Sequence, residues 1–199
     1  MYRFSVILVI AAMLACVSCN KRNYSNDDIY GRESRKPKTE NTQSAKKSNP
    51  GKKKANATGV DEAWRNLDIK LTRSDNRALY DELKSWLGTP YKYAAMEKGV
   101  GTDCSGLTMQ VYLTVFKKKI ERNSSRQYTQ NCTKVSRVDL REGDLVFFNN
   151  GNGGGINHVG IYLKEGYFVH ASSSRGVMVN NLAQRYYDSH FYCGGRVTR

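Results

Sequence analysis

One short stretch, Gly101-Thr-Asp-Cys-Ser-Gly-Leu, most constrains the fold, because it predicts a tight turn followed by a helix that begins at Cys104. Asp103 and Ser105 supply capping groups for the first turn of that helix. Apolar residues then recur at helical spacing, at Leu107, Val111 and Val115. A thiol in a first helical turn lies near unpaired N–H groups and the positive end of the helix dipole, and both favour the thiolate. The position therefore predicts a lowered pKa and a nucleophilic Cys104, with a small buried side chain as the alternative.

Two histidines downstream make the nucleophile the better interpretation. His158 and His170 lie twelve residues apart, on two predicted strands joined by a turn. This spacing sets the two rings close together and predicts Cys104 as nucleophile, His158 as its base and His170 as the group that orients His158. The third histidine, His190, has no such context and is expected to be structural. A zinc site on Cys104, His158 and His170 is disfavoured, because no closely spaced Cys or His pair occurs among them.

The order of the predicted elements indicates an α+β fold, in which helices come first and an antiparallel sheet follows. The helical patterns cover residues 74–87 with Ser74 as the N-cap, then 104–116, and a short helix from Asn123 or Ser124 to about Gln130. The strand patterns cover 144–148, 158–163, 167–171, 176–179 and 192–197. Before the first helix, residues 64–71 are expected to form a short strand or a packed extended arm.

The first nineteen residues are typical of an export signal. Arg3 is followed by an apolar run too short to span a bilayer comfortably, and the run ends at Cys16 and Cys19. The small residues before these cysteines resemble a bacterial lipoprotein cleavage site. We favour Cys19 over Cys16 as the lipidated residue, because the polar sequence begins directly after it. An ordinary secretory signal is the alternative.

Residues 20–60 are expected to be a flexible basic tether between this leader and a folded domain at 61–199. The tether contains eleven Lys or Arg and four Asp or Glu, a net charge of +7, which is half of the +14 of the whole chain. Nucleic-acid binding is disfavoured, because that function calls for basic residues interleaved with aromatic ones on a folded face. Attraction to an anionic membrane or cell-wall surface is the simpler expectation.

Five motifs in order resemble the NlpC-type cell-wall endopeptidases, a family of bacterial cysteine peptidases. They are Pro90-Tyr-Lys-Tyr, Asp103-Cys-Ser-Gly, Arg141-Glu-Gly-Asp-Leu-Val-Phe-Phe, His158-Val-Gly-Ile-Tyr and His170-Ala-Ser. The likeness covers about residues 75–197 and implies a compact papain-like domain, with N-terminal helices packed on an antiparallel sheet. One departure stands out, because Ala94-Ala95 occupies a place where many relatives have Gly-Gly.

The resemblance implies a role for each matching residue, with no cofactor and no metal. Cys104, His158 and His170 would be nucleophile, base and orienting group, and Tyr91 would lie near the oxyanion site. Asp103 and Ser105 would help to hold the free amino end of a peptide substrate. The implied reaction is hydrolysis of the bond between γ-D-glutamate and a diamino acid in peptidoglycan stem peptides, through an acyl-enzyme whose oxyanion is stabilised by N–H groups at the start of the Cys104 helix.

Several alternatives remain at this stage. The chain is also compatible with a catalytically silent cell-wall-binding lipoprotein, or with an amidase or acyl transferase of the same superfamily. Cys132 and Cys193 are either a disulfide or two buried thiols. We expect an exported lipoprotein, anchored in the membrane by its lipid, on the periplasmic face of the outer membrane of a Gram-negative bacterium. A regulatory or activating protein partner is left open.

Overall fold

The computed structural model describes residues 64–151 and 154–198. The predicted leader, the lipidation site at Cys19 and the tether of residues 20–60 lie outside the described residues. No helix within the described part of the chain is long and apolar enough to cross a membrane.

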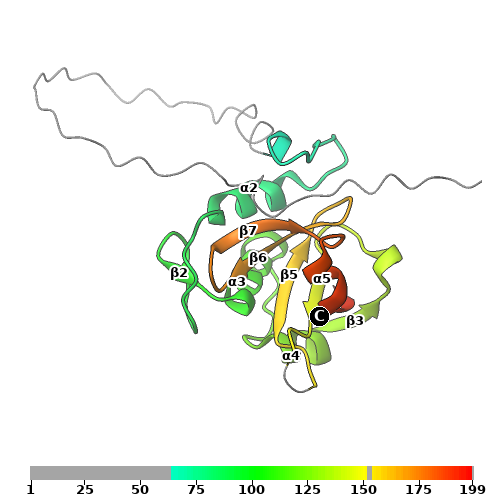
Figure 1. The fold of residues 1–199 in the computed structure, drawn as a ribbon. Helices are drawn as coiled ribbons and strands as arrows, with labels where there is room; N and C mark the ends of the chain where they lie inside the picture. The colour runs from blue at the N-terminus through cyan, green and yellow to red at the C-terminus, as the bar shows by residue number, and fades with distance from the viewer. Residues whose placement is uncertain (1–63, 152–153, 199) are drawn as a thin grey trace, which may run out of the picture. The chain divides into compact units, whose positions relative to one another are not determined.

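The centre of the fold is a six-stranded antiparallel sheet with the strand order β3-β8-β4-β5-β6-β7 (Figure 1). Its strands are β3 (Cys132–Val135), β4 (Leu145–Phe148), β5 (His158–Tyr162), β6 (Tyr167–Ser172), β7 (Gly176–Asn181) and β8 (Phe191–Val197). A separate two-stranded hairpin joins β1 (Met96–Glu97) to β2 (Gly101–Thr102). The helical elements are α2 (Arg77–Trp86), α3 (Cys104–Val111), η1 (Tyr112–Phe116), α4 (Ser124–Arg126), η2 (Gln127–Asn131), η3 (Arg137–Asp139) and α5 (Arg185–His190).

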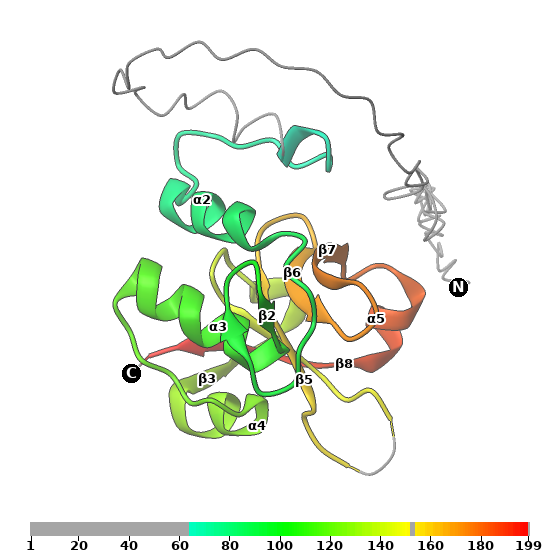
Figure 2. The same cartoon turned by 90° about the vertical axis from the view of Figure 1, so that its left-hand side faces the viewer.

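The sheet is buried on both faces, and its alternating side chains separate two apolar clusters. In β4, Leu145 and Phe147 belong to the main core with side chains of α2 and α3, whereas Val146 and Phe148 belong to a smaller cluster with Tyr187 of α5. Figures 1 and 2 show the corresponding arrangement, with β5 and β6 between α3 and α5. The predicted α+β fold, with helices packed on an antiparallel sheet, is confirmed.

The segment before the sheet differs from the prediction in two places. The first helix begins at Arg77 with Asn76 as its N-cap, rather than at Ser74, because the Asn76 side chain accepts the N–H of Leu79 at 3.2 Å. Residues 64–71 form no strand; Trp64 and Ile69 are instead fully buried in the main core, next to a short helical turn. The alternative of a packed arm is therefore the better description.

Five elements escaped the sequence analysis: β1, β2, β3, η3 and α5. Each is short or lacks a regular apolar pattern. The strands β1 and β2 pair with each other, whereas β3 pairs with β8, which is distant in sequence. The helix that begins at Cys104 does reach Phe116 as expected, but its last turn is the π-helical η1, and it ends at Lys117 with a positive φ of 57°. Cys132 on β3 and Cys193 on β8 are free thiols, so the disulfide alternative is not observed.

Candidate active site

The turn before α3 is built around the carboxylate of Asp103. Its Oδ1 atom accepts the N–H of Gly106 at 2.8 Å and thereby caps the helix, as the sequence predicts. Gly106 is required at this position, because a Cβ there would lie 2.5 Å from the carbonyl oxygen of Ala95. The helix start is thus pressed directly against the loop that precedes it.

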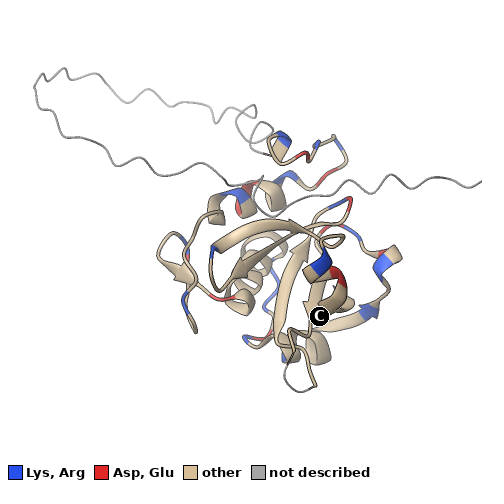
Figure 3. Ribbon diagram, viewed as in Figure 1, with Lys and Arg blue, Asp and Glu red and all other residues tan. Residues whose placement is uncertain are grey.

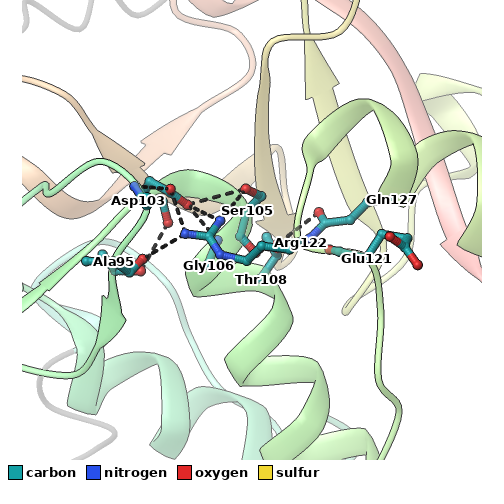
Figure 4. Close-up of polar contacts among 10 residues, drawn as sticks. Ala95, Asp103, Ser105, Gly106, Thr108, Glu121, Arg122 and Gln127 are labelled. Atoms are coloured by element: carbon teal, nitrogen blue, oxygen red, sulfur yellow. Dashed lines mark hydrogen bonds and ion pairs between the residues drawn. The ribbon is translucent and has the colours of Figure 1, made fainter.

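Arg122, which the sequence analysis missed, anchors this turn (Figure 4). Its two terminal nitrogens each donate to one oxygen of Asp103 at 2.7 Å, a bidentate ion pair. The same guanidinium donates to the Ser105 hydroxyl at 2.8 Å and to the Ala95 carbonyl oxygen at 3.1 Å. Arg122 therefore ties together the loop, the cap and the first turn of α3. No local sequence pattern marks it, because it lies in an irregular segment.

The Asp103 carboxylate is fully engaged by these contacts. Its Oδ2 atom also accepts the N–H of Ala94 at 2.8 Å. Burial acts to raise the pKa of Asp103, but the hydrogen bonds from Arg122, Gly106 and Ala94 outweigh it and hold this pKa below its usual value. The predicted role of Asp103 and Ser105 in holding a substrate amine remains a prediction, and such an amine would compete with Arg122 for the same oxygens.

Cys104 lies at the start of α3 with its side chain buried. The N–H groups of Val159, Ser105 and Cys104 itself are directed at the sulfur and act to lower its pKa. Burial, followed by the negative charge of Asp103, acts in the opposite direction and raises the pKa of Cys104 to about 11. The prediction of a lowered thiol pKa is therefore wrong, because burial outweighs the helix terminus.

Tyr91 lies beside this cysteine. It forms a β-bridge with Thr102, two residues before Cys104. Burial raises the pKa of Tyr91, and the neighbouring charges of Cys104 and Asp103 raise it further. The structure thus brings Tyr91 into the electrostatic environment of Cys104 and Asp103, and its place at the oxyanion site remains a prediction.

The two histidines meet in the sheet as their spacing predicts. Nε2 of His158 on β5 lies 2.9 Å from Nδ1 of His170 on β6. The register pairs Ile161 with Val169, so both histidine side chains project from the same face. Gly160 lies between them, and a Cβ there would be 2.8 Å from the Val169 carbonyl oxygen and 3.2 Å from the His170 Cβ. The glycine of the His-Val-Gly-Ile motif is what lets the two strands approach.

A further layer of polar residues surrounds His170. Its Nε2 atom lies 2.9 Å from Oδ1 of Asn180 on β7 and 3.1 Å from the hydroxyl of Tyr187 on α5. Neither residue was identified from the sequence, since no motif joins β7 or α5 to the histidines. The strands around the rings carry no charged residue, and Figure 3 shows β5 and β6 in tan along their length.

This environment favours neutral imidazoles, because it buries the rings and brings no negative charge to them. Burial, and after it the neighbouring His170, lower the pKa of His158 to about 3. Burial and the positive charge of Arg175 lower the pKa of His170 to about 4, against an opposing hydrogen bond to Asn180. Both rings are therefore uncharged at neutral pH.

Cys104 lies at the start of α3, and α3 packs against β5 and β6, the two strands that carry the histidines. The Val159 N–H that is directed at the Cys104 sulfur belongs to the residue directly after His158. The sulfur thus lies next to the strand that carries the proposed base. In the described ranges, 64–151 and 154–198, no group of three His, Cys, Asp or Glu side chains is placed to hold a metal ion.

Comparisons with known proteins agree with this architecture. The chain is 39% identical over 119 residues to the probable endopeptidase NlpC of Escherichia coli K12, covering 60% of this chain and 76% of the relative. It is 34% identical over 133 residues to the E. coli K12 protein named murein DD-endopeptidase MepS/murein LD-carboxypeptidase, covering 67% of this chain and 65% of the relative.

A solved structure and a family model cover the same region. A crystal structure of an NlpC/P60 family protein from Bacillus cereus superposes with a TM-score of 0.56 at 30% identity, over 64% of this chain and 42% of that one. The model of the NlpC/P60 family matches residues 88–196, which include Cys104 and both histidines of the pair. The chain belongs to the NlpC/P60 family.

Proposed function

We propose that this protein is a peptidoglycan hydrolase that cleaves stem peptides with Cys104 as its nucleophile. The observation that carries the proposal is a helix-start thiol next to the strand of His158, which is hydrogen-bonded to His170, in a chain of the NlpC/P60 family. The similar E. coli proteins named as an endopeptidase and as a murein endopeptidase support peptidoglycan as the substrate class.

The charges of the site favour a general-base mechanism over a preformed thiolate. Cys104 is a thiol and His158 a neutral imidazole at neutral pH, because burial raises the first pKa and lowers the second. His158 would accept the thiol proton as the sulfur attacks the scissile carbonyl carbon, and would then donate that proton to the leaving amine. A water molecule would hydrolyse the resulting thioester with His158 again as the base.

Two neighbouring features suit the oxyanion that forms during attack. The first N–H groups of α3 are directed toward the sulfur, so they are close to the carbonyl that the sulfur would attack. Tyr91, whose raised pKa keeps its hydroxyl protonated, would be a second donor. His170 would hold the His158 ring in place.

The bond that we propose is the one between γ-D-glutamate and the diamino acid, by resemblance to the NlpC-type enzymes. The 34% identity to a relative named murein DD-endopeptidase favours a second candidate, the crosslink between two stem peptides. Lipidation at Cys19 and a location on the periplasmic face of the outer membrane are further proposals, which rest on the sequence of residues 1–19.

Mass spectrometry of purified crosslinked muropeptides, incubated with wild-type protein, tests both the function and the bond. Cleavage at γ-D-glutamate yields a new amine on the diamino acid, whereas cleavage of the crosslink converts dimers to monomers with intact stems. We expect products with the wild type and with Cys193→Ala, a buried thiol outside the site, and none with Cys104→Ala. Hydrolysis that persists in Cys104→Ala would rule out the proposed nucleophile, and release of whole stems from the sugar would identify an amidase instead.

A further inference from the structure

We infer that Asn180 is a positioning residue that fixes which nitrogen of His158 carries a proton, and that it leaves Nδ1 of His158 free to act as the base. The inference deepens the proposed function and rests on it, because His158 acts as a base only in the proposed hydrolysis. It concerns residues of β7 and α5 that lie outside the histidine motifs. Asn180 is buried beneath the histidine pair, so it acts through His170 and not on a substrate.

The chain of hydrogen bonds that sets the tautomers begins at a backbone N–H group. The N–H of Asn181 can only donate, and its partner at 3.3 Å is Oε1 of Gln184. The same Oε1 atom lies 2.7 Å from the Asn180 side-chain amide. Since Oε1 is an acceptor, the Asn180 atom that faces it must be the donor Nδ2. This assignment turns Oδ1 of Asn180 toward His170.

The tautomers of both rings follow from that carbonyl oxygen. Oδ1 of Asn180 is only an acceptor, so Nε2 of His170, at 2.9 Å, must carry a hydrogen. Nδ1 of the neutral His170 ring then has a lone pair and accepts from Nε2–H of His158, also at 2.9 Å. A neutral His158 that carries its hydrogen on Nε2 has its lone pair on Nδ1.

Tyr187 makes the role of Asn180 necessary. Its hydroxyl donates to Oδ1 of Asn180 at 3.2 Å and also lies 3.1 Å from Nε2 of His170, which could accept from it in the other tautomer. If Tyr187 donated to Nε2, the hydrogen of His170 would move to Nδ1 and that of His158 would move from Nε2 to Nδ1. His158 would then have no lone pair on the nitrogen that faces away from His170. Oδ1 of Asn180 opposes this state, because it would face the lone pair of Nε2 at 2.9 Å.

The local sequence explains how one asparagine reaches this position. Along β7, Val177 and Val179 enter the main core, so Asn180 projects from the opposite face. The register places Asn180 across from Phe168, diagonal to His170 on the same face. Gln184, the N-cap residue of α5, then completes the hydrogen bonds of the asparagine amide.

Two-bond hydrogen–nitrogen NMR correlations on the full chain with isotope-labelled histidine test the inference directly at neutral pH. The chain has three histidines, and His190 lies outside the pair as an internal reference. In the wild type, we expect Nε2–H on both His158 and His170. Nδ1–H on His158 in the wild type would overturn the inference without any substitution.

Substitutions then distinguish a positioning role of Asn180 from a role in packing alone. Asn180→Leu removes the acceptor at similar volume, and we expect both rings to shift toward Nδ1–H, with kcat reduced about ten- to hundredfold and KM little changed. Tyr187→Phe removes the competing hydroxyl and leaves Asn180 in place, so it should retain the wild-type tautomers. Unchanged tautomers in a folded Asn180→Leu protein would contradict the inference.

The NMR and the muropeptide assay together also distinguish a failure of this inference from a failure of the proposed function. Nε2–H on both rings together with uncleaved muropeptides would leave the inference intact and remove the proposed function. Cleavage that depends on Cys104, in a protein whose His158 carries Nδ1–H, would do the reverse.

Discussion

The two halves of the candidate site are held in opposite ways. The turn that carries Cys104 is fixed by a charged pair, Asp103 with Arg122, and one third of the Arg122 side chain is exposed. The histidine pair is fixed by neutral hydrogen bonds to Asn180 and Tyr187 in the interior of the sheet. A carboxylate is suited to the first half because it caps free N–H groups, whereas any charge beside the second half would change the protonation of the base.

Both kinds of environment favour the same protonation state. Asp103 contributes to the raised pKa of Cys104, and burial without a counter-charge lowers the pKa of His158. The resting pair is therefore thiol and imidazole. The site thus places a carboxylate one residue away from the nucleophile and keeps carboxylates away from the base.

The largest effect is expected at the charged half. Arg122→Ala leaves the buried Asp103 carboxylate without its counter-ion and should reduce the free energy of unfolding by about 3 kcal/mol. Arg122→Lys keeps the charge but not the bidentate geometry, so about half of that loss should remain. Urea unfolding at pH 7 measures both. Arg126→Ala, an exposed arginine four residues away, is the matched control, and an equal loss there would contradict the account.

We expect the histidine pair to lower the free energy of unfolding in mild acid. The folded-state pKa values of His158 and His170 are lowered to about 3 and about 4, so between pH 4 and 6.5 the unfolded chain binds more protons than the folded one. Stability is therefore full above pH 6.5 and falls as the pH decreases. Each ring should contribute about 2 kcal/mol of loss between pH 7 and pH 5.

Urea unfolding at pH 7, 6 and 5 measures this loss, and His170→Gln should flatten the dependence. His190→Gln serves as the control for removing a histidine outside the network. A wild-type stability that is constant between pH 7 and pH 5 would contradict the lowered pKa values, because the folded and unfolded chains would then bind equal numbers of protons.

Gly160→Ala should damage the neutral half alone. The added methyl group would lie 2.8 Å from the Val169 carbonyl oxygen and would push β5 away from β6. We expect a destabilisation of about 1–2 kcal/mol and a loss of hydrolysis, with the Asp103–Arg122 pair unaffected. Thermal unfolding and the muropeptide assay measure the two effects. Full activity in this variant would show that the close approach of the histidines is not needed.

The smallest effect is expected at Ala94, on the charged half. Ala94 has a φ of 62°, a left-handed conformation that glycine adopts without strain. Ala94→Gly should therefore raise the free energy of unfolding by about 0.5 kcal/mol, after the entropy of the unfolded glycine is subtracted. Ala95→Gly, without a positive φ, should lower it instead. A change in the free energy of unfolding that has the same sign in both variants would contradict the strain assigned to Ala94.

The sequence was sufficient for the groups that local patterns determine. Asp103 caps the helix of Cys104, and the spacing of His158 and His170 correctly placed two rings on paired strands. Their surroundings were not predictable in the same way. Arg122, Asn180 and Tyr187 reach the site from segments whose positions depend on the loop after η1 and on the order of the strands. The pKa of Cys104 was mispredicted for the same reason, because burial is a property of the tertiary fold and the helix terminus is a local one.

The central claim is that Cys104 forms a covalent acyl-enzyme with the help of His158, and hydroxylamine partitioning tests it most directly. Hydroxylamine competes with water for a thioester, so muropeptides digested in its presence should yield a hydroxamate at the cleaved carbonyl. The account predicts that the hydroxamate fraction rises with hydroxylamine concentration for the wild type and that Cys104→Ala forms neither product. Cleavage that yields only the free carboxylic acid at every hydroxylamine concentration would contradict it, because water would then be attacking the peptide bond directly.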